Sequence, residues 1–238
     1  MDILADTFIK HKKLMLESLG ISEGVNDPVI FKAVFMAGGP GSGKSYAVKN
    51  IGLNGMGFKT VDSDAVYEKL LKKANLQMNP DVIYSPQGQK IRARAKALTG
   101  MREEDWVDGR LGIVIDGTGK DYNKISKTNQ LLKELGYETM MVLVNTDLKT
   151  AQERNMARAR KIPPSEVKNM WSGVQNNIGK LQTLFGMNNF MIIDNSEEHG
   201  GESGQQASNL YNKINTWANI VPRNKLAQDW IASQGGRI

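Results

Sequence analysis

A glycine-rich segment, Gly38–Ser45, contains the residues whose types and spacing point most clearly to chemistry. It reads GGPGSGKS and fits G-x-x-x-x-G-K-[ST], between an apolar run at 29–37 and a helical pattern at 43–52. Glycines let successive backbone N–H groups surround phosphate oxygens, and the N-terminus of the following helix favours the same anion. Lys44 is expected to bridge the β- and γ-phosphates, and the Ser45 hydroxyl to ligate Mg²⁺. The predicted contacts to the nucleoside triphosphate, expected to be ATP, are Gly39, Pro40, Gly41, Ser42, Gly43, Lys44, Ser45 and Tyr46.

Two aspartates follow the next short β pattern, GFKTVDSD at 57–64. Asp64 lies 20 residues after Lys44, and a carboxylate at the end of a strand there would lie beside the phosphate loop. A kinase needs a carboxylate that accepts the proton of the attacking hydroxyl, and we assign this role to Asp64. Asp62 is expected to hold a magnesium-bound water through Ser45 or to orient the substrate. Asp64 also directly precedes a helical pattern, so capping of that helix is an alternative role.

A third aspartate ends the apolar run at 111–119, which closes with Asp116-Gly-Thr118-Gly. A carboxylate at this position can serve the water shell of a bound Mg²⁺, as the Walker B acid does. Thr118 lies between two glycines and could contact the acceptor or a phosphate. The alternative is an ordinary strand-to-helix turn that uses Asp and Gly for their backbone tolerance. Asp116 is therefore a predicted metal and substrate residue, and Thr118 a predicted substrate residue.

Several cations recur along the helical pattern at 147–161. Arg154, Arg158 and Lys161 are spaced so that they share one face of a helix, whereas Arg160 points elsewhere on it. Arg154, Arg158 and Arg160 are the predicted contacts of this segment to the nucleotide phosphates. Two consecutive prolines then break the pattern before a new helix begins. Two helices with a short hinge and a basic inner face are typical of a kinase lid, whose arginines neutralise the charge of the transferring phosphoryl group. The alternative is a solvated basic face with no ligand.

The overall composition limits the chemistry further. The chain has 238 residues, with 31 Lys and Arg against 25 Asp and Glu, and a formal charge of +6. It has no cysteine and only two histidines, His11 and His199, which excludes thiolate chemistry and disfavours a His-rich metal site. Its apolar runs are too short to cross a bilayer, and its start has no signal-peptide layout. We therefore expect a cytoplasmic protein with an anionic partner and no membrane contact.

Strand and helix patterns alternate from residue 29 onward. The predicted strands are 29–37, 57–64, 111–119, 137–146 and 188–195. The predicted helices between them are 43–52, 64–75, 87–99, 121–135, 147–161 and 165–185. This alternation is typical of an α/β fold with a five-stranded parallel sheet and helices on both faces.

The chain divides into a predicted core at 29–195 and two terminal extensions. Residues 1–28 are expected to form an N-terminal helical extension, because apolar positions recur at helical spacing between 3 and 19. The core contains a long insertion at about 65–110 and the lid at about 150–170. The predicted C-terminal part consists of a flexible loop at 196–208, a helix near 208–219 and a polar tail that carries Trp230.

Taken in this order, the elements resemble the branch of P-loop kinases that contains polynucleotide 5′-kinases and zeta toxins, over about residues 30–195. The phage polynucleotide kinases share P-G-S-G-K-S, here Pro40–Ser45, the aspartate at position 64 and an aspartate-threonine turn like that at 116–118. Their lid is similar to Arg154-Asn-Met-Ala-Arg158. The resemblance implies a three-layer P-loop kinase fold, ATP and Mg²⁺ as cofactors, and phosphate-binding roles for the two lid arginines.

One position departs from the polynucleotide kinases. They place an arginine that grips the 3′-phosphate of the acceptor just after the base, where this chain has Tyr67. Zeta toxins phosphorylate nucleotide-sugars and share the A-G-G-x-G-S-G-K-S style of loop and the x-D-x-D strand ending. Phage 5-hydroxymethyluracil DNA kinases are a further, closely similar group. The resemblance therefore leaves several hydroxyl acceptors open.

A run of cations in the insertion favours a nucleic-acid acceptor. Five cations lie between 85 and 102 with no acid among them: Lys90, Arg92, Arg94, Lys96 and Arg102. On a helix, Ile91, Ala95 and Leu98 would form an apolar stripe flanked by these cations, which could then contact a phosphate backbone. The alternative is a solvated helix with extended side chains. Tyr67, Tyr84 and Trp106 are candidates for stacking on a base, or else core residues.

The resulting hypothesis is an ATP- and Mg²⁺-dependent kinase of a hydroxyl group on a nucleic acid. The acceptor would be a 5-hydroxymethylpyrimidine in DNA, flipped from the stack, or a 5′-hydroxyl end. Two alternatives stand beside it: a zeta-toxin-like kinase of a nucleotide-sugar or another small metabolite, and a nucleotide-binding switch protein that has no acceptor. The predicted acceptor residues are Asp62, Asp64, Tyr67, Arg92, Arg94, Asp116 and Thr118.

Overall fold

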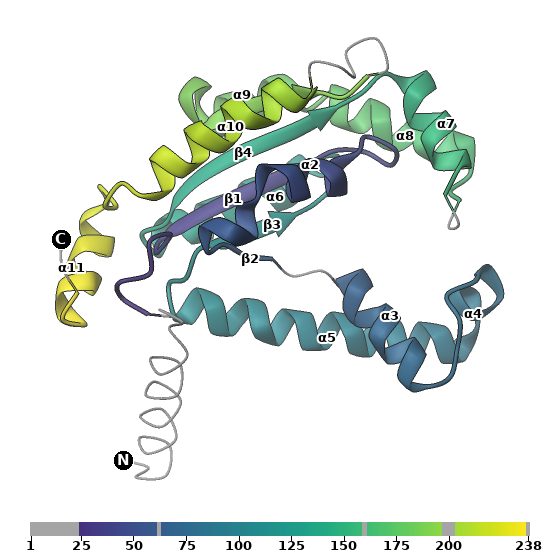
Figure 1. Cartoon of the computed structure of the whole chain (residues 1–238), viewed down its shortest axis with the longest axis horizontal. Helices are drawn as coiled ribbons and strands as arrows, with labels where there is room; N and C mark the ends of the chain where they lie inside the picture. Colours follow the sequence, from purple (N-terminus) through teal and green to yellow (C-terminus); the bar gives the residue numbers. More distant parts are fainter. Residues whose placement is uncertain (1–23, 61–62, 159–160, 197–202, 237–238) are drawn as a thin grey trace.

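A parallel sheet forms the centre of the fold. The computed structural model describes residues 24–60, 63–158, 161–196 and 203–236 (Figure 1). Within this part, the strands are β1 (Lys32–Ala37), β2 (Lys59–Thr60), β3 (Ile113–Asp116), β4 (Glu138–Asn145) and β5 (Phe190–Asp194). They pair in the order β2-β3-β1-β4-β5, and every pair is parallel. The predicted five-stranded α/β fold is confirmed, and parallel pairing brings all carboxyl ends to one edge of the sheet.

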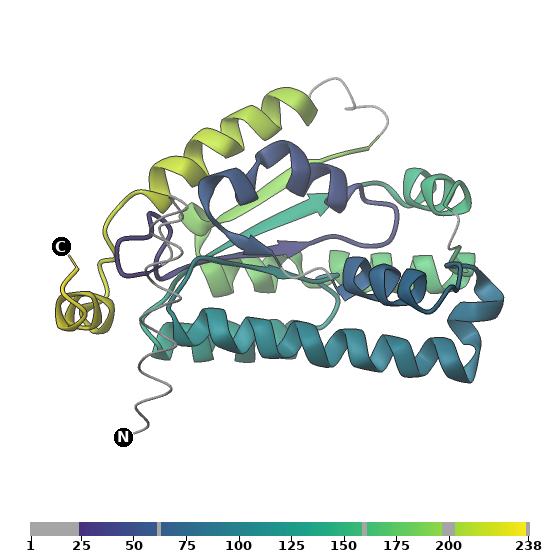
Figure 2. The ribbon, with the colours of Figure 1, turned by 60° about the horizontal axis from the view of Figure 1, so that its bottom comes forward.

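Helices cover both faces of the sheet and one of its edges (Figures 1 and 2). The described helices are α2 (Lys44–Ile51), α3 (Ser63–Lys73), α4 (Pro80–Tyr84), α5 (Pro86–Asp108), α6 (Tyr122–Glu134), α7 (Leu148–Met156), α8 (Pro164–Gln175), α9 (Ile178–Phe185), α10 (Ser203–Ala218) and α11 (Lys225–Ser233). Two 3₁₀ turns, η1 (Leu53–Met56) and η2 (Met187–Asn189), connect elements. The predicted helix at 165–185 is wrong as a single element, because Asn176 and Asn177 separate α8 from α9.

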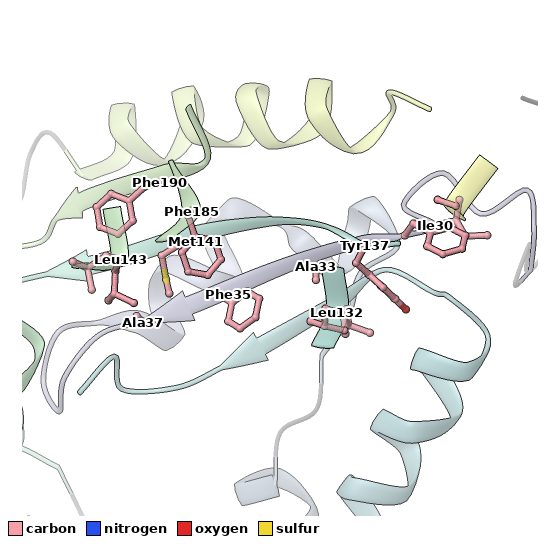
Figure 3. Packing of buried hydrophobic residues seen from close by; sticks show 14 of the residues in the cluster. Ile30, Ala33, Phe35, Ala37, Leu132, Tyr137, Met141, Leu143, Phe185 and Phe190 are labelled. Atoms are coloured by element: carbon pink, nitrogen blue, oxygen red, sulfur yellow. The ribbon is translucent and has the colours of Figure 1, made fainter. Parts of the chain in front are cut away.

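Two hydrophobic cores lie on opposite faces of the sheet. Met141 and Leu143 pack toward α6, α8 and α9, whereas Val142 and Val144 pack toward α2 and α10. In the first core the rings of Phe35 and Phe185 meet edge-on, with centroids 5.1 Å apart (Figure 3). Because β4 is buried on both faces, its sequence is a continuous apolar run and does not alternate between apolar and polar residues. Such a run can be recognised as a strand from the sequence alone.

Helices α3, α4 and α5 form an arm beside the β2 edge of the sheet (Figure 2). A small core of Tyr67, Leu71, Ile83 and Ala95 joins them. The predicted stripe on α5 is partly wrong, because Leu98 is 40% exposed and faces away from this core. Its buried residues recur at helical spacing instead: Gly88, Ala95 and Thr99.

The C-terminal part contributes to both main cores. The predicted loop at 196–208 is wrong at its end, because α10 begins at Ser203. The predicted polar tail forms α11, and Trp230 packs edge-on against Phe31 with centroids 5.4 Å apart. The predicted helix at 3–19 and the predicted loop residues 197–202 lie outside the described residues. Among the described helices, none is long and apolar enough to span a membrane.

Candidate phosphoryl-transfer site

The phosphate loop connects β1 to α2 at the carboxyl edge of the sheet. Gly41 and Gly43 have φ angles of 79° and 84°, which only glycine adopts at low cost. A Cβ on Gly41 would collide with the carbonyl of Ala151 in α7, and one on Gly43 would collide with the side-chain amide of Asn195. The glycines therefore allow the loop to curl and also let the lid region and the end of β5 pack directly against it.

Ser42 has a side chain whose surroundings fit a loop that binds an anion. The residue is 2% exposed, and its Oγ has no hydrogen-bond partner within the described structure. Its backbone N–H donates to the Gly39 carbonyl at 3.1 Å, which closes the turn. A buried hydroxyl without a partner and a turn of backbone amides ahead of a helix N-terminus are features of a site that holds phosphate oxygens.

Lys44 joins the phosphate loop to the end of β3. Its Nζ lies 2.6 Å from Asp116 Oδ1 and donates to the Gly117 carbonyl at 2.8 Å. The Asp116 side chain is 46% exposed, so the ion pair opens to solvent. The Gly38 N–H donates to the Thr118 carbonyl at 3.2 Å, which brings the half-buried Thr118 to the same loop. The structure thus assembles Lys44, Asp116 and Thr118 at one place, as their positions at strand ends predict.

Asp64 lies in the first turn of α3, directly after the β2 edge strand. It is exposed and does not precede the helix as the sequence pattern predicts, because α3 already begins at Ser63. A carboxylate in a first turn is stabilised by the helix dipole. Asp62 lies outside the described residues.

The lid differs from the sequence prediction in one main respect. Helix α7 ends at Met156, so Arg154, Arg158 and Lys161 do not share a helix face. The cause is Asn155, whose fully buried side chain makes two hydrogen bonds to the backbone of Ile162. Its Nδ2 donates to the Ile162 carbonyl at 2.7 Å, and its Oδ1 accepts from the Ile162 N–H at 3.1 Å. This pair of bonds reverses the chain and ends the helix.

The two predicted lid arginines therefore have different positions. The Arg154 Nη1 donates to the Asn195 carbonyl at 2.8 Å, close to Gly43 of the phosphate loop. Arg158 follows the end of α7 and is exposed. Arg160 lies outside the described residues. Arg154 is thus the lid cation that the structure places beside the loop.

Polar residues at the ends of β4 and β5 hold the lid in place, and the sequence patterns did not reveal them. The Asn195 Nδ2 donates to the Ser42 carbonyl at 2.8 Å. The Trp171 Nε1 of α8 donates to the Thr146 carbonyl at 2.8 Å. The Thr150 hydroxyl and N–H bond the Asp147 carboxylate, which caps α7, and these bonds lower the pKa of Asp147 below its ordinary value. The only sequence signal for Thr146 and Asn195 is that each ends a predicted strand, whereas Asp147, Thr150 and Trp171 fall within predicted helices.

This geometry agrees with the comparison to known families. A model of the zeta toxin family matches residues 26–200, which include the whole sheet, the phosphate loop and the lid. The chain belongs to the zeta toxin family. It is therefore a P-loop phosphotransferase that uses a nucleoside triphosphate. Membership in this family does not favour the alternative of a switch protein without an acceptor.

Several solved structures are similar to the chain at low sequence identity. The PezAT toxin–antitoxin system of Streptococcus pneumoniae matches with a TM-score of 0.52 and 19% identity, over 79% of this chain and 77% of that chain. A gluconokinase from Sinorhizobium meliloti 1021 has a TM-score of 0.45 and 14% identity, over 79% and 95%. The Pnkp1/Rnl/Hen1 RNA repair complex has a TM-score of 0.47 and 16% identity over 63% of this chain, which spans 46% of that chain. No curated protein matches closely enough to count as a relative.

The residues predicted to hold Mg²⁺ fit the ion's chemistry where the structure describes them. Ser45 is exposed at the start of α2, and Asp116 lies beside Lys44 at the same edge. No group of three or more His, Cys, Asp or Glu side chains gathers within the described ranges. Mg²⁺ in nucleotide sites takes one or two protein oxygens and completes its shell with phosphates and water. Ser45 and Asp116 would therefore be sufficient protein partners for it.

A cleft runs along the face of β3 and leads away from the phosphate loop of this zeta-family chain. Its volume is about 520 Å³, and it lies between the C-terminal half of α5, the strand and α6. Ile115, which lines it, directly precedes Asp116. Trp106 and Leu132 supply apolar walls, and Glu103 lies among the polar lining. Burial raises the pKa of Glu103, and the charge of Lys124 opposes this shift.

The positive charge of the arm lies in its first part. Residues 63–100 hold seven cations and three acids, a net +4, whereas the end of α5 at 101–108 adds one cation and four acids. Arg92 is half-buried and Arg94 is exposed on α5. Tyr84 is 73% exposed, whereas Trp106 is half-buried against the first core.

The prediction that Tyr67 stacks on a base is wrong. The side chain is 1% exposed and lies inside the small core that joins α3 to α5. It occupies the inner face of α3 at helical spacing from Leu71, so the same periodicity that forms the helix buries the ring.

Proposed function

We propose that the protein transfers the γ-phosphoryl group of ATP to a hydroxyl group of a small metabolite, with a nucleotide-sugar as the acceptor class and Mg²⁺ as the metal. Membership in the zeta toxin family carries this proposal. The cleft beside β3 supports it, because its volume of about 520 Å³ falls within the range of about 300 to 1,000 Å³ that is typical of small-molecule sites. Its lining ends at Ile115, the residue before Asp116, whose carboxylate pairs with Lys44.

Each site residue has a role in this reaction. Bound ATP with Mg²⁺ supplies the transferable phosphoryl group. The loop amides and Lys44 bind the phosphates, and Lys44 exchanges its contact with Asp116 for them. Asp64 accepts the proton of the acceptor hydroxyl. Arg154 neutralises charge that develops on the transferred group, because its guanidinium already lies beside the loop.

A second candidate acceptor is a nucleic acid, either a 5-hydroxymethylpyrimidine in DNA or a 5′-hydroxyl end. The observation that favours it is the net +4 over residues 63–100 of the arm, with no acid on α5 before Arg102. Exposed cations such as Lys90 and Arg94 could bind a phosphate backbone. A base acceptor would have to leave the stack to reach Asp64.

Transfer from γ-labelled ATP to three acceptors separates these candidates: a nucleotide-sugar mixture, 5′-hydroxyl DNA and DNA that contains hydroxymethyluracil. The proposal expects label in the sugar fraction, with a rate that does not respond to a Lys90→Glu/Arg94→Glu variant. Label in DNA alone contradicts it and supports the second candidate. In that case the double variant should lower transfer and weaken its salt dependence, whereas Lys213→Glu, an exposed cation on α10, serves as the matched control.

A further inference from the structure

We infer that Asn195 is a positioning residue that links Arg154 to the phosphate loop, so that the guanidinium is set beside Gly43 before a nucleotide binds. The inference rests on the proposed role of Arg154 at the phosphates. Asn195 follows β5 at the carboxyl edge of the sheet and is half-buried. Its side chain bonds the phosphate loop, and its backbone bonds Arg154.

The side chain holds the phosphate loop. Its Nδ2 donates to the Ser42 carbonyl at 2.8 Å, across 153 positions of sequence. The approach is so close that any residue with a Cβ at position 43 would collide with this amide. Gly43 therefore leaves the space that the Asn195 side chain occupies. Through this side chain the residue after β5 is hydrogen-bonded to the phosphate loop.

The backbone of Asn195 holds Arg154. The Asn195 N–H donates to the Asn145 carbonyl at 2.9 Å, which fixes the residue to the end of β4. Its carbonyl then accepts from Arg154 Nη1 at 2.8 Å and from Thr146 Oγ1 at 3.4 Å. Arg154 thus reaches the loop through a residue that the sheet already orders.

Within the part of the chain that the structure describes, the Arg154 guanidinium lies near the loop and has no acidic partner. Its Nη1 lies 3.8 Å from the place where a Cβ on Gly43 would be. A long side chain loses rotamer freedom when it is ordered, so ordering by Asn195 in the nucleotide-free protein removes part of that loss from ATP binding.

A double-mutant cycle in ATP affinity tests the link, with Mg²⁺-ATP titrated by calorimetry into the full chain and no acceptor present. Asn195→Ala keeps the backbone carbonyl that holds Arg154 and removes only the bond to the Ser42 carbonyl, so the guanidinium is no longer fixed relative to the loop. The change is expected to weaken ATP binding about 10-fold in the wild type and less than about 2-fold in the Arg154→Ala background. Asn195→Asp keeps the size of the side chain but cannot donate to the Ser42 carbonyl, so it should weaken binding at least as much. Asn176→Ala, an exposed asparagine with no side-chain hydrogen bond in the described residues, is the control and should bind like the wild type.

Equal losses from Asn195→Ala in both backgrounds would overturn the inference, because a purely structural effect adds to that of Arg154. Unchanged affinity in Asn195→Ala would overturn it as well. Because the cycle measures binding alone, it is independent of the acceptor. Failure of every acceptor in the transfer assay would refute the proposed function and leave the cycle interpretable.

Discussion

Replacement of Gly43 by alanine is the sharpest structural test of the phosphate loop. The residue has φ 84°, a left-handed conformation that costs a residue with a Cβ roughly 1 to 2 kcal/mol. The new Cβ would also collide with the Asn195 amide and displace it from the Ser42 carbonyl. Loss of that hydrogen bond costs about 1 kcal/mol more. We therefore expect Gly43→Ala to lower the free energy of unfolding by about 2 to 3 kcal/mol.

Chemical and thermal unfolding, followed by circular dichroism, measure this effect. For a chain of this size the expected loss corresponds to a melting temperature that is roughly 5 to 10 °C lower. Gly179→Ala in α9 is the matched control, because a Cβ there meets nothing within 4 Å and its φ is not positive. The control should be neutral or more stable by up to about 1 kcal/mol, since alanine is the better helix former.

A comparison with the double variant Gly43→Ala/Asn195→Ala separates the two causes. Without the Asn195 amide the collision disappears, so the double variant should lose less than the sum of its two single changes. If Gly43→Ala unfolds at the wild-type denaturant concentration, the loop does not have the left-handed geometry and close packing described above, and the reasoning is refuted.

Three further predictions concern the lid, the cleft and the arm. Asn155→Ala removes both bonds to Ile162 and should cost about 2 kcal/mol of unfolding free energy, measured by urea denaturation; wild-type stability would contradict the account of why α7 ends. The pKa of Glu103 is raised in the folded state, so folding favours the protonated form of this side chain. As the pH rises above 4.5 and through the folded pKa, the free energy of unfolding of the wild type should therefore fall relative to that of Glu103→Gln, which does not titrate. The urea midpoint of unfolding is measured for both proteins across this pH range. If the two midpoints change with pH in parallel, the prediction is wrong. Tyr67→Phe removes a buried hydroxyl that has no partner in the described structure and should raise stability by about 1 kcal/mol, whereas a loss above that size would show that the hydroxyl is bonded.

The sequence predicted the sheet and the phosphate loop well because both depend on local patterns. The apolar run of β4 is visible without knowledge of its neighbours, and GGPGSGKS requires only the strand before it and the helix after it. The sequence also predicts both Lys44 and Asp116 at the phosphates, whereas the pairing of β1 with β3, which brings them together, is seen only in the structure.

The lid and the residue after β5 could not be predicted in the same way. Helical periodicity placed Arg154 and Arg158 on one face, but the buried Asn155 takes the backbone of Ile162 as its partner and ends the helix. The role of Asn195 depends on a contact with Ser42, which no local pattern encodes because 153 positions separate them. Such long-range polar contacts become visible only when the fold brings strand ends together.

One measurement tests the central claim that this zeta-family site transfers phosphate to a hydroxyl with Asp64 as the base. Single-turnover transfer from γ-labelled ATP is compared between the wild type and Asp64→Asn, with ATP affinity measured in parallel. We expect transfer to fall by about 100-fold or more in Asp64→Asn, while ATP affinity changes by less than about 2-fold. Transfer at the wild-type rate by Asp64→Asn, or no transfer by the wild type to any hydroxyl acceptor, would contradict it.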